Sequence, residues 1–386
     1  MSLKYDILLK NGYLIDGTGS KGKDNVTVGI KDGNITYIGR DNITSDKLYG
    51  DKIIELDGAT ILPGFINAHV HAGFKYVGNR VLRDFQKEYL QKCIKEGVTT
   101  VRDEGMFTDD TIDTVVEKRN LYKDYIEFPR IIITGKFFSA PGGYGGQAPI
   151  AIETIEDAKT HVHNVIFKGI DMIKTVLEEG LDPSTYGLPK LSDELLSAIC
   201  MEAHKRNTKV SAHVTQSHNL KRLIAAGIDD AGHMVYDHLS DELITDLVQK
   251  NIYVVSTLTV LKMFEDKFGA PLLETGKNNV RRFVEAGGKI AFGDDFIEVE
   301  EPWYRLGMPY MELQLLKDAG LSELQIITAA TKHGAEVCNV AHETGTLELG
   351  KKADILIVRG NPETDINNIK NVLMVLKEGK EAVNKI

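Results

Sequence analysis

Short apolar runs alternate with amphipathic stretches through the middle of the chain. The runs cover residues 60–66, 99–102, 130–134, 171–176, 209–213, 230–234, 252–256 and 289–292. Between them, apolar positions recur with the helical period in residues 82–96, 155–168, 193–206, 241–250 and 278–286. Alternating strands and helices predict a parallel sheet, and eight repeats in roughly 280 residues match a (β/α)₈ TIM barrel. A doubly wound open sheet is the alternative, but its Gly-x-Gly-x-x-Gly turn is missing after the first run.

Both ends of the chain have a different pattern, with short strands separated by turn residues. The first end carries apolar runs at 6–9, 12–15, 26–30, 35–39 and 52–56, and the second at 353–358 and 372–378. Neither end alone has enough apolar surface for a core, so we expect the two to pack together. The predicted organisation is a small discontinuous β-sandwich domain (residues 1–59 and 346–386) around a barrel domain (residues 60–345).

Composition narrows the class of partner. The chain has 386 residues and a net charge of -10, so phosphates of nucleic acid or of an anionic membrane would be repelled over most of the surface. The three cysteines, Cys93, Cys200 and Cys338, are far apart and in no metal-ligand spacing. No apolar stretch approaches the length of a membrane span. We expect a cytoplasmic protein that acts on a small molecule, with a homo-oligomer left open.

Histidines and acidic residues follow several of the predicted strands. His69 and His71 end the first run, and residues two apart on a strand project to the same side, where one metal ion can bind both. A hydrogen-bonded histidine pair at a strand end fits that motif equally well. In a barrel, functional residues lie at the carboxyl ends of the strands. There the chain also places Lys174, His213, His233 and the pair Asp294-Asp295.

This order of residues resembles the amidohydrolase superfamily, and the prolidase and imidazolonepropionase branch in particular. The resemblance rests on Leu-Pro-Gly-Phe-Ile-Asn-Ala-His-Val-His (62–71), Val-Thr-Thr-Val-Arg-Asp (98–103), Ile-Ala-Phe-Gly-Asp-Asp (290–295) and the closing stretch 344–354. It implies a binuclear site of divalent metals, with zinc expected. The implied ligands are His69, His71, Lys174, His213, His233 and Asp295.

The roles of Lys174 and Asp295 follow from that resemblance. A buried amine loses its proton more easily, and the resemblance implies that Lys174 takes up CO₂ as a carbamate that bridges the two metals. A strand lysine paired with Asp171 or Asp295 is the alternative. Adjacent strand residues face opposite ways, and the register favours Asp295 over Asp294 as the ligand.

The implied reaction is hydrolysis of an amide bond. A metal-bridging hydroxide would attack, with Asp295 as general acid and base, and the expected substrates are dipeptides or N-acyl amino acids. Alternatives are hydrolysis of a cyclic amide or carbamate, deamination and a non-catalytic binding protein. Deamination is less favoured because no glutamate follows His213 in the sequence. A degenerate binding protein is least favoured because the ligand set is complete.

Substrate contacts are harder to predict. The candidates near the barrel rim are Tyr144, Tyr236, His238 and Arg102. Two loops depart from the family pattern: Gly-Gly-Tyr-Gly-Gly stands at 142–146, where Gly-Gly-His-Gly is expected, and Val-Leu-Glu-Glu-Gly at 176–180 replaces a Ser-Gly-Gly. Because both loops would shape the pocket, the sequence leaves the substrate side chain open.

Overall fold

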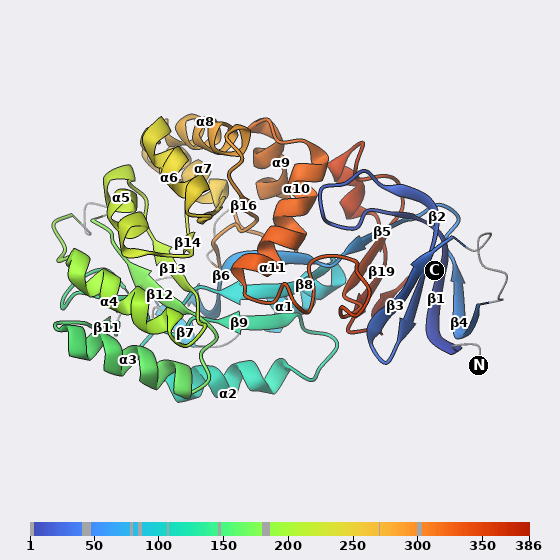
Figure 1. The fold of residues 1–386 in the computed structure, drawn as a ribbon, viewed down its shortest axis with the longest axis horizontal. Coiled ribbons are helices and arrows are strands. Elements are labelled where there is room, and N and C mark those ends of the chain that lie inside the picture. Colours follow the sequence, from blue (N-terminus) through green and yellow to red (C-terminus); the bar gives the residue numbers. More distant parts are fainter. Residues whose placement is uncertain are drawn as a thin grey trace.

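The computed structural model describes residues 4–40, 48–77, 80–83, 87–105, 108–145, 148–179, 186–269, 271–298 and 303–386. Gly146 and Gly180, from the two loops that depart from the family pattern, lie outside these ranges. Figure 1 shows the helices and the parallel strands on one side and a sheet built from both chain ends on the other. Among the described residues, no helix is long and apolar enough to cross a membrane.

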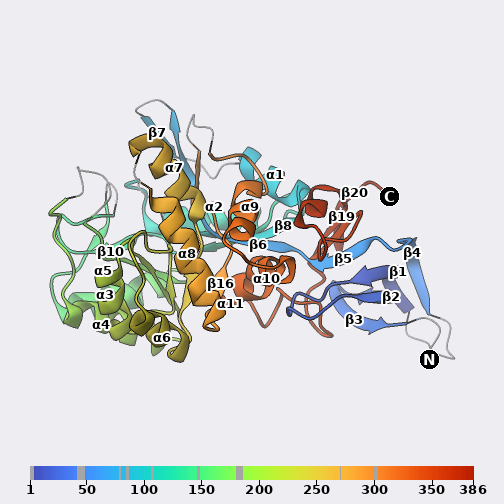
Figure 2. The ribbon, with the colours of Figure 1, turned by 90° about the horizontal axis from the view of Figure 1, so that it is seen from above.

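The strands of the two chain ends pair in one sheet, whereas the prediction has them pack together as a β-sandwich. The path of this sheet runs β20-β19-β18-β5-β1-β2-β3, with β4 paired to β1. We call it the end sheet; Figure 2 shows it from above. The strands are β1 (Lys4–Leu14), β2 (Lys23–Lys31), β3 (Asn34–Gly39), β4 (Tyr49–Glu55), β5 (Thr60–Pro63), β18 (Ile355–Val358), β19 (Val372–Lys377) and β20 (Lys380–Asn384). The alternating apolar positions of these strands form a separate core that includes Leu9, Val28, Ile61 and Ile357.

The middle of the chain forms parallel strands that are separated by helices. One sheet runs β11-β10-β12-β13-β14-β15-β16 and another runs β17-β6-β8-β9, with β7 on β6. Their strands are β6 (Phe65–Val77), β7 (Arg80–Arg83), β8 (Val98–Asp103), β9 (Arg130–Ile133), β10 (Phe137–Ser139), β11 (Ile150–Ala151), β12 (Ile173–Val176), β13 (Val210–His213), β14 (Asp230–Ala231), β15 (Tyr253–Val255), β16 (Ile290–Ala291) and β17 (Phe296–Glu298). Backbone hydrogen bonds link these sheets at both sides, from Asp171 N to Ile133 O (3.0 Å) and from Ala68 N to Phe292 O (2.8 Å).

The helices include one in each of the five stretches with a helical period and others that the periodicity did not predict. They are α1 (Lys87–Lys95), α2 (Ile112–Tyr122), α3 (Ile155–Phe167), α4 (Asp193–His204), α5 (Ser217–Ala226), α6 (Asp241–Gln249), α7 (Leu258–Phe268), α8 (Leu272–Glu285), α9 (Tyr310–Asp318), α10 (Glu323–Thr328) and α11 (Gly334–Val337). Ser or Thr side chains cap several of them; Thr154, for example, accepts from the backbone of Asp157 at the start of α3. The helix expected over 82–96 begins later, because residues 80–83 pair with β6 as β7.

The first apolar run is two strands and not one. Residues 60–63 belong to the end sheet as β5. The next strand, β6, begins at Phe65 and belongs to the sheet β17-β6-β8-β9. Gly64 lies between them, where a Cβ would come within 2.1 Å of the Thr99 hydroxyl. The prediction of one strand over 60–66 is therefore wrong, because an apolar run does not show that the chain changes sheet. As β6 extends to Val77, His69 and His71 lie within it and not at its end.

Candidate active site

His69 and His71 project from β6 to one side, as their spacing predicts, and meet Asp295. Their rings are 1% and 4% exposed, and Nε2 of each lies 3.1 Å from the same Asp295 oxygen, Oδ1. Nδ1 of His69 lies 2.8 Å from the carbonyl oxygen of Gly232, and Nδ1 of His71 lies 2.8 Å from that of Gly105. A carbonyl oxygen only accepts, so each Nδ1 donates, and a ring in its neutral form turns the Nε2 lone pair towards Asp295.

This arrangement suits a cation. The Nε2 lone pairs of His69 and His71 and the Oδ1 atom of Asp295 all point into the same small space. They repel one another there unless a positive charge lies between them. Among the described residues, Oδ1 of Asp295 is buried without a hydrogen bond of good geometry. The three ligand atoms lie within 4.8 Å of one another, and imidazole nitrogen with carboxylate oxygen is a donor set that zinc and its neighbours accept. The residues present therefore fit a divalent metal.

The charges of the three groups are coupled. Burial raises the pKa of Asp295, but the two imidazoles outweigh burial and hold this pKa well below its usual range. Burial lowers the pKa of His69, whereas the Asp295 carboxylate outweighs burial at His71 and raises its pKa. Asp295 is thus an acceptor for a metal or a proton at neutral pH. Its backbone has φ 57° and donates to the carbonyl oxygen of His69 at 3.0 Å.

A second pair of histidines, His213 and His233, lies beside the cluster of His69, His71 and Asp295. Nδ1 of His213 lies 3.0 Å from Nε2 of His233, and the rings of His233 and His69 have centroids 4.6 Å apart. Nε2 of His213 lies 3.3 Å from the buried Glu178 carboxylate, and Nδ1 of His233 lies 3.0 Å from the Thr257 hydroxyl. These partners hold the rings so that the two inner nitrogens face each other, which is the geometry of orienting groups around metal-bound histidines.

Lys174 lies close to the first cluster but has a strong partner of its own. Its side chain is fully buried on β12 and forms an ion pair with Glu104, which follows β8. A Cβ at Gly232 would be 2.8 Å from Nζ of Lys174 and 3.2 Å from Cε1 of His69, so both side chains pack on this glycine. The sequence predicts Asp171 or Asp295 as the anion for an uncarbamylated lysine; the structure places Glu104 there instead.

Arg102 does not lie where we expected it. The prediction places it at the barrel rim as a substrate contact, but its side chain is fully buried. Its two terminal nitrogens bind both oxygens of Asp230 at 2.9 Å, and Nε lies 2.7 Å from Glu104 and donates to the carbonyl oxygen of Ala68. Since each of its three nitrogens is bound inside the protein and the side chain is fully buried, Arg102 holds strands together and is not available to a substrate.

Of the remaining predicted contacts, Tyr144 lies against the second histidine pair. Tyr144 stacks on the ring of His213, with centroids 4.8 Å apart and planes at 19°. Tyr236 is half-buried, accepts a hydrogen bond from Gln216, and has its pKa raised by burial. His238 is exposed. Substrate binding by these three residues stays a prediction.

Sequence reasoning missed two groups around the site, Glu104 and Glu178. Glu104 and Glu178 each follow a strand that the pattern identified, so the rule about strand ends could have found both. Asp294 is buried and accepts from Asn67 at 2.7 Å, and burial raises the pKa of this carboxyl to about 8. As predicted, Asp295 and not Asp294 meets the histidines, but alternation along a strand is not the reason, because β16 ends at Ala291 and Asp295 has φ 57°.

Comparison with known proteins bears on this geometry. The profile of the Amidohydrolase family matches residues 60–382. The chain belongs to the Amidohydrolase family. It is 24% identical to an imidazolonepropionase from Geobacillus sp. (strain WCH70), over 92% of this chain and 91% of that protein.

Two solved structures share the fold. One is a Xaa-Pro dipeptidase with bound methionine in the active site (TM-score 0.82, 24% identity, 97% of this chain and 99% of that one). Another is a prolidase complexed with N-methylphosphonate-L-proline (TM-score 0.78, 22% identity, 98% and 100%). Together with the family match, the relatives identify this member of the Amidohydrolase family as a hydrolase of carbon–nitrogen bonds in the prolidase and imidazolonepropionase-like branch.

Proposed function

We propose that this hydrolase cleaves the amide bond of dipeptides or N-acyl amino acids with metal ions held by the histidine and aspartate cluster. One observation carries the proposal: the Nε2 atoms of His69 and His71 converge on one oxygen of Asp295, with ring orientations set by backbone carbonyls. A divalent metal bound there would polarise the scissile carbonyl and lower the pKa of a water molecule.

The protein groups then have separate tasks. His69, His71 and Asp295 hold the metal, and the low pKa of Asp295 keeps it a carboxylate that can accept a proton and pass it to the leaving nitrogen. His213 and His233 supply further ligands, oriented by Glu178 and Thr257. Tyr144 and Tyr236 flank this side and are proposed to contact the substrate, with His238 at the edge.

The metal count is also a proposal. Two zinc ions bridged by a carbamate on Lys174 are what the family resemblance implies, and the His213–His233 pair supports a second metal position. The ion pair between Lys174 and Glu104 is the contact that a carbamate would have to replace. The small-molecule substrate, the cytoplasmic location and a homo-oligomeric state likewise remain proposals.

A closed (β/α)₈ barrel with a discontinuous small domain is proposed as the overall architecture. It is supported by the backbone bonds that link the parallel sheets at both sides, and by the single sheet that both chain ends form. The predicted domain limits at 59/60 and 345/346 belong to this proposal.

The similarity to imidazolonepropionase favours a second candidate, the hydrolysis of a cyclic amide. The test is a substrate screen of dipeptides, N-acyl amino acids and cyclic amides with the zinc-loaded protein, alongside metal analysis. We expect turnover of a linear amide that falls at least about 10³-fold in Asp295→Asn, and metal content near two per chain that drops in Lys174→Ala. No turnover of any amide would refute the function, and unchanged metal content in Lys174→Ala would refute the carbamate.

A further inference from the structure

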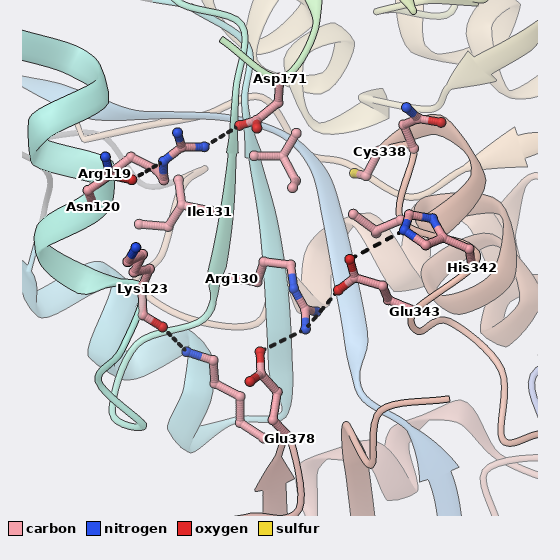
Figure 3. A pocket seen from close by; sticks show the side chains of 14 residues that line it. Arg119, Asn120, Lys123, Arg130, Ile131, Asp171, Cys338, His342, Glu343 and Glu378 are labelled. Atoms are coloured by element: carbon pink, nitrogen blue, oxygen red, sulfur yellow. Dashed lines mark hydrogen bonds and ion pairs between the residues drawn. The ribbon is translucent and has the colours of Figure 1, made fainter. Parts of the chain in front are cut away.

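A cavity of about 370 Å³ lies between the parallel strands and the end sheet, and none of the predicted metal ligands lines it. Its walls come from the end of α2, the start of β9, the segment after α11 and the turn between β19 and β20, as Figure 3 shows. The volume lies within the range of small-molecule sites.

Lys377 contributes a buried ammonium group to this cavity. Its side chain is only 5% exposed, and Nζ donates to the backbone carbonyl oxygens of Tyr125 (3.1 Å) and Lys123 (3.5 Å). Among the described residues, no carboxylate forms an ion pair with it. An ammonium group has three donors and a buried charge is costly without a counter-charge, so an anion at the third donor would stabilise this position.

The other charged groups select the kind of anion. Arg119 is held by Asp171 at 2.7 Å, Arg130 is held by Asp354 at 2.8 Å, and Lys123 lines the opening with an exposed side chain. Glu343 and Glu378 also reach Arg130, yet their side chains are 41% and 44% exposed and face the same cavity, as Figure 3 shows. Such carboxylates repel a phosphate or another multivalent anion and attract a positive group.

Apolar wall remains between the charges. Ile131 and Val340 line the cavity together with Ile132. A ligand with one carboxylate, one ammonium group and an apolar side chain therefore matches three parts of the cavity at once.

We propose that this cavity binds a free α-amino acid, with its carboxylate at Lys377 and its ammonium group between Glu343 and Glu378. The proposal does not depend on the amide hydrolysis proposed above, because binding is measured without turnover. Because β9 and the β19–β20 turn both line the cavity, a bound amino acid would also strengthen the contact between the barrel strands and the end sheet.

The test is isothermal titration calorimetry of the full-length, metal-loaded protein with leucine. The matched ligand is 4-methylpentanoate, which has the same carbon chain and carboxylate but lacks the amine. We expect leucine to bind wild-type protein more tightly than either 4-methylpentanoate or inorganic phosphate. Lys377→Met should weaken leucine binding at least tenfold. Lys385→Met is the control, because Lys385 also donates to a backbone carbonyl of the end sheet but lies outside the cavity.

A second variant keeps the proposal testable if Lys377→Met does not fold. Glu343→Gln changes an exposed side chain and should weaken leucine binding while leaving 4-methylpentanoate binding unchanged. The proposal is overturned if Lys377→Met binds leucine like wild type, or if phosphate binds more tightly than leucine. It is also overturned if the leucine signal persists in Lys377→Met but disappears in His71→Ala, which would place the amino acid at the metal ligands.

Discussion

The substitution Glu104→Gln tests whether the buried charges beside the proposed metal ligands are mutually dependent. Glu104 is fully buried, with one oxygen 2.7 Å from Nε of Arg102 and the other paired with Lys174. The second oxygen also accepts a hydrogen bond from Ser211 at 2.9 Å. Gln keeps the shape but removes the charge, and its amide nitrogen must then face a cation.

The magnitude follows from this environment. Removing one partner of a fully buried ion pair leaves an uncompensated charge and costs about 3–5 kcal/mol. Burial raises the pKa of Glu104, but Arg102 and Lys174 outweigh burial and lower it to about 2. A carboxylate with a depressed pKa stabilises the fold fully above its unfolded pKa of about 4.3, and this contribution is lost only as the pH falls towards 2. The full effect is therefore expected at pH 7.

The assay is equilibrium unfolding in urea at pH 7, with a chelator present so that metal binding does not contribute. Glu274→Gln is the matched control, because Glu274 is 74% exposed and pairs with Lys277 on the surface of α8. That exposed pair should change the unfolding free energy by at most about 1 kcal/mol. If Glu104→Gln costs no more than the control, then Glu104 does not compensate the charges of Lys174 and Arg102, and the reasoning is refuted.

Two further predictions concern buried charges elsewhere. Burial raises the pKa of Asp294 to about 8, so between about pH 4 and pH 8 the folded chain keeps a proton that the unfolded chain has released, and stability should fall as the pH rises. Asp294→Asn should flatten this slope in thermal melts of chelated protein from pH 5 to 8; equal slopes would contradict the prediction. Arg130 joins β9 to the buried Asp354 beside the end sheet, so Arg130→Gln should cost roughly 3 kcal/mol in urea unfolding. Arg281→Gln, on the exposed face of α8, is its control, and an equal effect of the two would count against that role.

Much of the site could be predicted before the structure. The alternation of apolar runs and amphipathic stretches located the strands β8, β9, β12, β13 and β15 to within two residues at each end. The spacing of His69 and His71 on an extended chain required the two rings to share a side. The prediction also chose Asp295, and not Asp294, as the residue that meets them, although the backbone there is not the extended strand that the prediction assumed.

Other features depend on contacts between residues that are far apart in the sequence, which a local sequence pattern does not predict. The chain changes sheets at Gly64 because only a glycine fits against Thr99 there. Arg102 lies near the end of β8, where the pattern suggests a functional residue, but the tertiary structure turns it onto Asp230, which is distant in the sequence. Lys174 forms its ion pair with Glu104, which is likewise distant in the sequence.

The sequence by itself determined which residues can reach one face of each strand, because side-chain direction follows from backbone geometry within a few residues. Only the tertiary structure decided which of those side chains meet one another. A buried charge is stabilised by the counter-charge that lies nearest to it, and which one lies nearest is set by how the parallel strands pack together. For this protein, the histidine and aspartate cluster could therefore be predicted, whereas the partners of Lys174, Arg102 and Lys377 could not.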